Sequence, residues 1–397
     1  MATIEKRGDS YRIIVSCGFD VNGKRIKRSM TWKPDRAYTP KQLEKALNKA
    51  AVEFEEKVLS GEVAADSRLK LVDFIPQYME SAKLKLEPTT IAEYTRVIDK
   101  YILPALGHLR LKDIRPAHVQ KFVNMLSSGE YRQDGKTGAL KPASVKRYYA
   151  VLQSILSAAY RLELLPSNPT DSGKITLPTM DEQKTDIMSK EQLAEMLEAL
   201  DSEPLQLQVI IHLAIITGCR RGELTSLKWS DINFDKCEIT VSKSLYQLKG
   251  EKAKTKRTKN KKKRFVTIPE YCIELLRQLH IEQTEKRFRL GTAWNGTADN
   301  YLFIKNDGSV MHPNTPTEQF NDFLERHELK HIKFHALRHT SATLSLLNGA
   351  NIKQVAARLG HSQLSTTNRY LHAIQEADRT IADSLGDTLT ALKQKRA

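Results

Sequence analysis

The sequence predicts a multidomain protein that is mainly α-helical and carries small β-sheets. The chain has 397 residues, which is too many for one ordinary hydrophobic core. β-branched and aromatic runs open the chain, helical apolar spacing fills its middle, and its C-terminal half mixes helical segments with short β-rich runs. We therefore expect three domains: a β-sheet plus helix in residues 1–66, a helical domain in 67–176, and a mixed α+β domain in 186–397.

The first domain is predicted to be a three-stranded sheet with one helix. Residues 11–15 and 25–32 are β-branched and aromatic, and the polar residues between them favour a hairpin turn. Apolar residues at helical spacing follow in residues 39–61. Residues 1–36 hold nine Lys or Arg against four acids. This charge suits either a solvated face of the sheet or a sheet that contacts a DNA groove. The candidate contacts are Arg25, Lys27 and Arg28.

The middle domain has an all-helical pattern. Apolar residues recur every three or four positions in segments near 71–82, 89–103, 116–127 and 142–163. A polar, glycine-rich stretch at 129–138 is predicted to be an exposed loop. The last helix places cations beside aromatics, in the order Lys146, Arg147, Tyr148 and Tyr149. That pattern suits a DNA contact, and it equally suits a half-buried amphipathic helix.

The third domain contains a very basic stretch between two β-rich runs. Helices are expected near 189–200 and 203–217, followed by β-rich runs at 238–247 and 264–268. Residues 249–264 hold ten Lys or Arg and one acid. Because like charges at that density repel, the stretch should be mobile unless an anion neutralises it. A nuclear-localisation or nonspecific patch has the same composition. Its place inside a hairpin favours a finger that faces DNA, with Lys254, Lys256 and Arg257 as contacts.

Composition narrows the class of protein further. The net charge is +16 and the hydrophobic content is 40%, which indicates folded cores and a polyanionic partner such as nucleic acid. No apolar run approaches the ~20 residues that span a bilayer, and the N-terminus lacks the pattern of a secretion signal. The four cysteines are scattered without a CxxC pair, which disfavours a disulfide scaffold or a cysteine zinc site and fits a reducing cytoplasm.

Two short motifs pair an arginine with a residue three positions away. In Thr217-Gly218-Cys219-Arg220-Arg221-Gly222-Glu223, a glycine break puts Arg220 near a helix start, with Glu223 on the same face to orient it. The alternative is an ordinary surface ion pair of little energetic value. In His335-Ala336-Leu337-Arg338-His339, His335 and Arg338 share one helix face. His331, His335 and His339 could also suggest a metal site, but no carboxylate lies at ligand spacing and the arginine would repel a cation.

The third motif supplies a histidine and a tyrosine. It runs Leu359-Gly360-His361-Ser362-Gln363-Leu364-Ser365-Thr366-Thr367-Asn368-Arg369-Tyr370. Together the motifs hold what phosphoryl transfer without a metal requires. Forked guanidinium groups match the oxygens of a pentavalent phosphorane, a tyrosine can attack a phosphodiester, and a hairpin lysine can protonate the leaving hydroxyl. The sequence has no phosphate-binding GxxxxGK[ST] loop and no acidic cluster for two magnesium ions, so we expect neither ATP nor any other cofactor.

The ordered motifs resemble those of the tyrosine recombinase family. Residues 102–107 (ILPALG) and 167–169 (SNP) are similar to the helical core-binding domain of phage-type integrases, and the full layout resembles the integrases of Gram-positive conjugative transposons. The resemblance implies an arm-type DNA-binding domain in residues 1–66, a core-binding domain in 67–176, and a catalytic domain in 186–397 that ends in a C-terminal exchange helix.

The resemblance also implies roles for individual residues. Arg220 and Arg338 would clamp the scissile phosphate, His361 would donate a further hydrogen bond, and His335 would assist proton transfer. Tyr370 would be the nucleophile. The family's lysine precedes a strand like Arg264-Phe265-Val266-Thr267-Ile268-Pro269, which favours Lys259 and leaves Lys254 and Lys256 as alternatives.

The implied function is integration and excision of a mobile element. A homotetramer would bind DNA attachment sites, cut one strand per active protomer through a 3′-phosphotyrosine, and exchange strands, with an excision factor as a further partner and no membrane partner. One rival is a type IB topoisomerase, which shares the constellation but relaxes supercoils as a monomer. The other rival is a noncatalytic DNA-binding repressor on the same scaffold.

Overall fold

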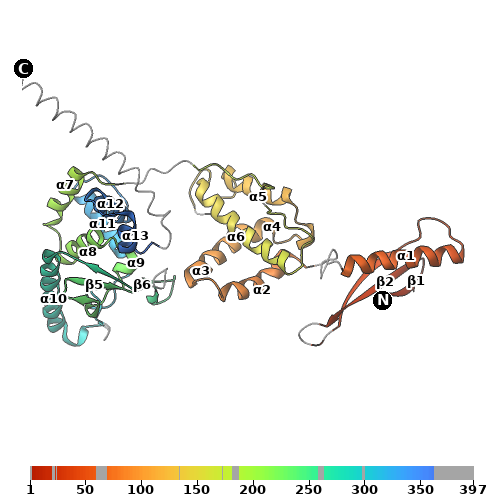
Figure 1. Ribbon diagram of the computed structural model, residues 1–397, viewed down its shortest axis with the longest axis horizontal. Coiled ribbons are helices and arrows are strands. Elements are labelled where there is room, and N and C mark those ends of the chain that lie inside the picture. Colours follow the sequence, from red (N-terminus) through yellow and green to blue (C-terminus); the bar gives the residue numbers. More distant parts are fainter. Residues whose placement is uncertain are drawn as a thin grey trace, which may run out of the picture. The chain divides into compact units, whose positions relative to one another are not determined.

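The computed structural model describes residues 2–19, 23, 25–59, 69–133, 135–171, 173–180, 187–257, 263–296 and 300–361. The chain forms two compact units, residues 1–182 and 183–397. Figure 1 labels the helices and strands of both units. The predicted fold class is confirmed, since helices predominate and the sheets are small and antiparallel. The boundaries of the three expected domains stay a prediction. In the described part of the chain, no helix has both the length and the apolar character needed to cross a membrane.

The N-terminal elements form a three-stranded antiparallel sheet with a helix on one face. The strands β1 (Thr3–Arg7), β2 (Ser10–Phe19) and β3 (Arg25–Trp32) lie in the order β1-β2-β3, and α1 (Pro40–Leu59) follows. The expected hairpin and helix are therefore confirmed. Alternate residues of β2 point toward α1, because side chains of a strand alternate between faces. Their small core is made of Ile13, Val15, Leu47, Ala51 and Phe54.

The register of this sheet separates two of the basic candidates. Lys27 pairs with Ser16, whereas Arg28 pairs with the buried Val15. Arg28 therefore lies on the face that α1 covers, and its Nε and Nη1 atoms are buried without a hydrogen-bond partner among the described residues. Arg25 lies on the same open face as Lys27, where its Nε donates to Ser16 Oγ at 3.1 Å. Of these three candidates, Arg25 and Lys27 are therefore the two that face the open side of the sheet.

The helical part of the first unit agrees closely with the expected segments. It contains α2 (Leu71–Lys83), α3 (Pro88–Val97), α4 (Leu103–Leu106), α5 (Pro116–Ser128) and α6 (Pro142–Arg161). Pro88, Pro116 and Pro142 each start a helix, where the missing N–H has no intrahelical partner to lose. A π-turn at Ile98–Ile102 joins α3 to α4. We attribute this widening to Pro104, because a proline ring would clash with the carbonyl of residue 100 in a regular helix.

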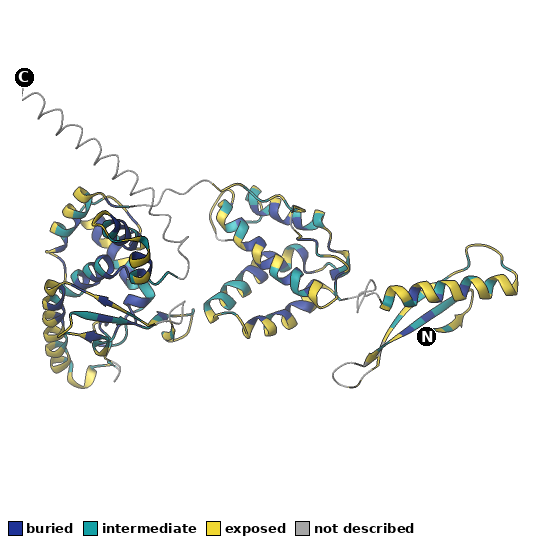
Figure 2. Ribbon diagram, viewed as in Figure 1, coloured by how far each residue is buried: buried dark blue, intermediate teal, exposed yellow. Residues whose placement is uncertain are grey.

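The second unit is built around the apolar helix α8 (Leu205–Thr217), which is buried along nearly its whole length (Figure 2). It packs against α10 (Glu270–Leu290), α11 (Thr315–Arg326) and α12 (Phe334–Leu347). Three further α-helices occur in the described residues of this unit: α7 (Lys190–Leu200), α9 (Arg221–Leu224) and α13 (Ile352–Leu359). Because three helices pack on α8, the turn at its C-terminal end is held against the core.

Two small sheets flank this helical core. The strands β4 (Ile232–Asn233), β5 (Glu238–Val241) and β8 (Arg264–Thr267) form one antiparallel sheet, and β6 (Lys243–Tyr246) pairs with β7 (Lys254–Arg257) in a hairpin. The basic stretch does lie between two apolar strands, as expected, but four of its residues form β7 instead of a mobile loop. Neighbours offset its charge: Lys254 pairs with Glu251, and Lys256 lies 5.3 Å from the centre of the Tyr246 ring.

Candidate active site

The turn that carries Arg220 begins at the glycine that ends α8. Gly218 has a left-handed backbone with φ of +59°, and a Cβ atom there would lie 2.3 Å from a side-chain carbon of Leu359. Only glycine therefore suits this position. The chain then enters α9, with Arg220 as its N-cap. Glu223 accepts the backbone N–H of Arg220 at 3.1 Å and its Nη1 at 2.9 Å. The predicted orientation of Arg220 by Glu223 is thus present in the structure.

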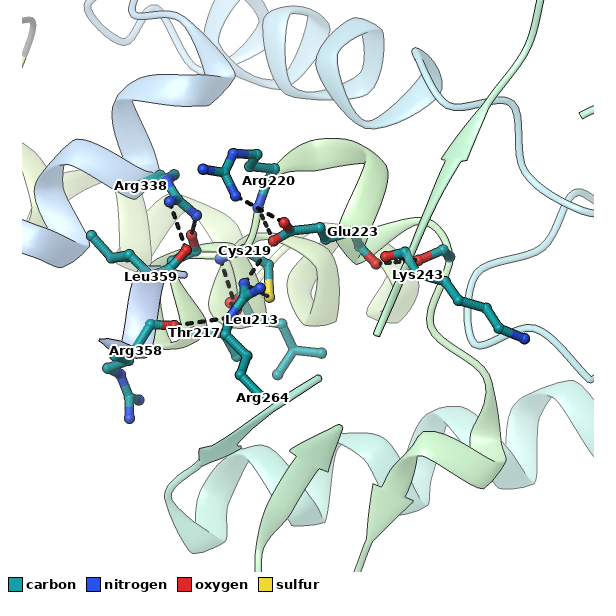
Figure 3. A network of polar contacts seen from close by, with 12 residues as sticks. Leu213, Thr217, Cys219, Arg220, Glu223, Lys243, Arg264, Arg338, Arg358 and Leu359 are labelled. Atoms are coloured by element: carbon teal, nitrogen blue, oxygen red, sulfur yellow. Dashed lines mark hydrogen bonds and ion pairs between the residues drawn. The ribbon is translucent and has the colours of Figure 1, made fainter. Parts of the chain in front are cut away.

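Glu223 lies between two arginines. Its side chain is 2% exposed, and Arg264 Nη2 donates to its Oε2 at 2.6 Å from the side opposite Arg220 (Figure 3). Burial alone would raise the pKa of Glu223, but the hydrogen bond and charge of Arg264 and the charge of Arg220 outweigh burial and lower it. The carboxylate is therefore ionised at neutral pH.

Arg338 is held by carbonyl groups instead of a carboxylate. It is 3% exposed on α12, and its guanidinium donates to the carbonyl oxygens of Gly218 and Leu359. These carbonyls belong to the turn before Arg220 and the turn before His361. Burial, followed by repulsion from Arg220, lowers the pKa of Arg338 to about 10, so the group stays cationic at neutral pH. Arg338 thus ties together the three segments that carry the predicted site residues.

The two predicted histidines lie close to Arg220 and Arg338. The side chain of His335 is exposed on α12, but neighbouring atoms displace part of its hydration. This desolvation and the charges of Arg338 and Arg220 lower the pKa of His335. His361 follows the turn at Gly360, and burial, then the same two arginines, lower its pKa to about 4. Both imidazoles are therefore neutral at pH 7 in the free protein. A further ring, His339, lies 4.8 Å from His335 between ring centres.

The structure brings together four of the six predicted catalytic residues: Arg220, His335, Arg338 and His361. Tyr370 and Lys259 lie outside the described residues, as does the expected C-terminal exchange helix. The alternative lysines, Lys254 and Lys256, lie on β7. Within the residues that the structure describes, no group of His, Cys, Asp or Glu side chains could hold a metal ion.

Sequence reasoning overlooked Arg264 as a member of this site. A signal for it was present, because β-strand alternation puts Arg264 on the same face as the buried Val266, and a buried arginine requires a partner. The partner itself could not be inferred, since Glu223 lies 41 positions earlier in the chain.

In the helical part of the first unit, the basic candidates lie outside the core, whereas the aromatics beside them are buried. Tyr148 and Tyr149 are buried in the core of the first unit, as an amphipathic helix requires. Arg147 is exposed and pairs with Glu93 at 3.3 Å, and Lys146 is half-buried. The aromatics between the cations therefore serve packing, which leaves only the cations for a DNA contact.

Comparisons with known proteins identify relatives of this chain. The family model described as "Phage integrase family" matches residues 186–376, and "Phage integrase, N-terminal SAM-like domain" matches residues 70–127. A "Tyrosine recombinase XerC-like" protein of Caldanaerobacter subterraneus is 29% identical, over 95% of this chain and 96% of its own. The "ICEBs1 integrase" of Bacillus subtilis is 27% identical, over 98% of this chain and all of its own.

A solved structure extends the likeness to the fold. The integrase of the Tn1549 transposon, in complex with a circular intermediate DNA, superposes with a TM-score of 0.63 at 17% identity. The match covers 79% of this chain and 99% of the other.

Proposed function

The chain belongs to the phage integrase family of tyrosine recombinases, and from this premise we propose that it cuts and rejoins attachment-site DNA through a 3′-phosphotyrosine on Tyr370. Its activity is site-specific DNA recombination, and nothing in the comparisons favours the topoisomerase alternative. The observation that carries the proposal is the convergence of Arg220, Arg338, His335 and His361 from three separate segments.

The two arginines would clamp the scissile phosphate. The side chain of Arg220 is 34% exposed while Glu223 holds it from one side, so its guanidinium keeps donors for a phosphate oxygen. Arg338 would place a second cation beside the charge that develops on phosphorus, and the two neutral imidazoles would add hydrogen-bonding groups. His361 would donate a hydrogen bond to a phosphate oxygen, and His335 would accept the proton of the nucleophile.

The proposed step is a transesterification. The phenolic oxygen of Tyr370 bonds to phosphorus as the bond from phosphorus to the 5′ oxygen breaks, and Lys259 protonates the leaving oxygen. Lys254 and Lys256 remain alternatives for that lysine. The 5′ hydroxyl of a partner strand then attacks the phosphotyrosine and releases Tyr370. Because the ester conserves the bond energy, the reaction as proposed requires no nucleotide and no metal cofactor.

The biological role would be integration and excision of a conjugative element. This proposal is supported by the names of two similar proteins, the ICEBs1 integrase and the Tn1549 integrase. A homotetramer on two DNA sites would provide the four tyrosines of strand exchange, an excision factor would set its direction, and the expected site of action is the cytoplasm.

Three basic surfaces would hold the DNA. We propose that Lys254, Lys256 and Arg257 follow the backbone beside the cleavage site, where phosphate contacts position a protein without reading sequence. Lys146 and Arg147 would serve the core site within a core-binding domain of residues 67–176. Arg25 and Lys27, on the open face of the sheet, would contact distant arm sites within residues 1–66. Arg28, on the covered face, is the least accessible of these candidates.

The decisive experiment uses a duplex with a nick near the crossover site, which traps the covalent intermediate. The parent protein should form an adduct that maps to Tyr370, and Tyr370→Phe should bind the duplex within a few-fold of the parent yet form none. An adduct in Tyr370→Phe would refute the assigned nucleophile. A topoisomerase would also relax supercoiled plasmid but join no second duplex, and a repressor would form no adduct at all.

A further inference from the structure

Arg264 contacts Glu223 more closely than Arg220 does, yet the proposed chemistry gives it no task. Its side chain is 12% exposed, against 34% for Arg220. An arginine buried this deeply loses much of its hydration, and it is retained only where several acceptors replace the lost water. The acceptors around Arg264 therefore indicate what it does.

These acceptors come from separate segments of the fold. Arg264 starts β8, the strand that follows the basic stretch. Its Nη2 reaches Glu223 on α9 and lies 3.6 Å from Cys219 Sγ in the preceding turn, whereas its Nε donates to the carbonyl oxygen of Arg358 at 2.9 Å (Figure 3). Arg358 is in the last turn of α13, three residues before His361. One guanidinium thus joins the Arg220 segment to the His361 segment.

Strand β6, at the other end of the basic stretch, is fixed to the same turn. The backbone of Gly222 on α9 packs against β6 so closely that a Cβ atom there would lie 2.6 Å from Ser244 Oγ and 2.8 Å from the carbonyl oxygen of Leu245. Ser226 Oγ also donates to the carbonyl oxygen of Lys243 at 2.9 Å. The strands β6 and β8, which lie at either end of the basic stretch, are therefore both anchored on α9.

We propose that Arg264 is a positioning residue. It locks the Glu223–Arg220 pair, the turn before His361 and the strands β6 and β8 into one unit facing the scissile phosphate. The proposal rests on the proposed function. Arg264 itself does not touch the DNA. It acts by holding Glu223 in place and ionised, so that Glu223 can hold Arg220.

The electrostatics around Glu223 give this proposal a distinctive signature. The groups that face its carboxylate are Arg220 on its own turn, Cys219 before that turn, Arg264 from β8 and Arg338 from α12. Without Arg264, the buried carboxylate would keep Arg220 as its direct partner, and burial would favour its neutral form. Its pKa would rise, and the grip on Arg220 would weaken as the pH falls.

The test compares Arg264→Met with Arg326→Met. Arg326 makes an equally short 2.6 Å pair with another buried carboxylate, Glu203, and is therefore a matched control. Cleavage of the nicked duplex is measured at saturating DNA from roughly pH 6 to 9, a range that extends to both sides of neutral pH. Because misplacement of a catalytic group costs about 10²-fold, Arg264→Met should lose cleavage by that order, with DNA affinity nearly unchanged. Its rate should also fall toward acid pH more steeply than that of the parent, whereas Arg326→Met should match the parent throughout.

Two further variants make the outcome specific. In Glu223→Gln with Arg264→Met the titrating carboxyl is gone, so the extra loss of cleavage rate toward acid pH should disappear. Arg264→Lys keeps a charge beside Glu223 but cannot also reach the Arg358 carbonyl, so its cleavage should fall at least threefold with a parent-like pH profile. This variant decides the matter if Arg264→Met does not fold.

The proposal is overturned if Arg264→Met cleaves like Arg326→Met, or if its DNA affinity falls as much as its cleavage rate. It is also overturned if the extra loss of rate at acid pH persists in Glu223→Gln with Arg264→Met, or if Arg264→Lys is as active as the parent. A parent protein that forms no adduct would instead refute the proposed function.

Discussion

Two glutamates in the second unit are buried beside cations, and their surroundings differ in an informative way. Glu223 has a side chain 2% exposed, and it divides its oxygens between Arg220 and Arg264 from separate segments. Glu203 is 7% exposed, and it receives both Nε and Nη2 of Arg326 together with His327 Nε2, all from the end of α11. Each carboxylate is satisfied, but Arg326 turns two donors to Glu203, whereas Arg220 turns a single guanidinium nitrogen to Glu223.

The distinction lies in how the donors are used. Arg326 directs two donors at one carboxylate, a bidentate geometry that fixes α11 to the turn between α7 and α8. Arg220 directs only Nη1 at Glu223, and among the described residues its guanidinium has no other acceptor. We infer that the Glu203 cluster serves stability and that the Glu223 cluster serves orientation. The same pair of residue types can therefore do either task, and burial alone does not separate them.

The largest expected effect comes from replacing Arg220 by lysine. Lysine keeps the charge but loses the planar fork that matches phosphate oxygens. At saturating DNA, Arg220→Lys should lower cleavage of the nicked duplex by about 10²–10³-fold, the usual cost of losing one donor to a transition-state charge. DNA binding should persist, because most phosphate contacts lie elsewhere. The rate is measured as adduct formed per unit time in single turnover.

Arg326→Lys is the matched control, and it should cleave at the parent rate. A change of less than threefold in Arg220→Lys would remove Arg220 from the phosphate clamp. An equal loss in both variants would show that the two clusters do not differ in the way proposed here.

The next effect concerns stability. Glu203→Gln removes the charge from a bidentate pair, and it should lower the free energy of unfolding by about 1–2 kcal/mol. The value is set toward the low end for a charged hydrogen bond because Arg326 is half exposed and water screens it. Cleavage at saturating DNA should be unchanged. Urea unfolding and the nicked-duplex assay, run on the same preparation, check both halves of the expectation. A loss of cleavage without a loss of stability would reverse the assignment of the two clusters.

Local patterns predicted most elements of this fold but not the contacts between distant ones. Helical periodicity and prolines located α2, α5 and α6, and the i, i+3 spacing correctly paired Arg220 with Glu223. The partner of Arg264 was out of reach, because tertiary packing brings β8 against α9 and no local rule specifies it. The face on which Arg28 lies depends on strand register, because a slip of one residue moves each side chain to the other face of the sheet. Strand β7 was missed because its charge indicated repulsion, whereas pairing with β6 and the contacts to Glu251 and Tyr246 offset that repulsion.

The smallest expected effect is the pH dependence of the Glu203 cluster. Burial raises the pKa of Glu203, but hydrogen bonds from Arg326 and His327 outweigh burial and lower it below its ordinary value. A carboxyl with a lowered folded-state pKa contributes stability that is complete above its unfolded value, about 4.3, and that is lost as the pH falls through the folded value. The stability difference between parent and Glu203→Gln should therefore be constant just above that window and shrink below it. Urea unfolding of both proteins in steps from about pH 5.5 downward measures the difference. A difference that persists undiminished at the acid end would mean that the charge of Glu203 contributes nothing, and that its hydrogen bonds hold α11 equally well when the carboxyl is neutral.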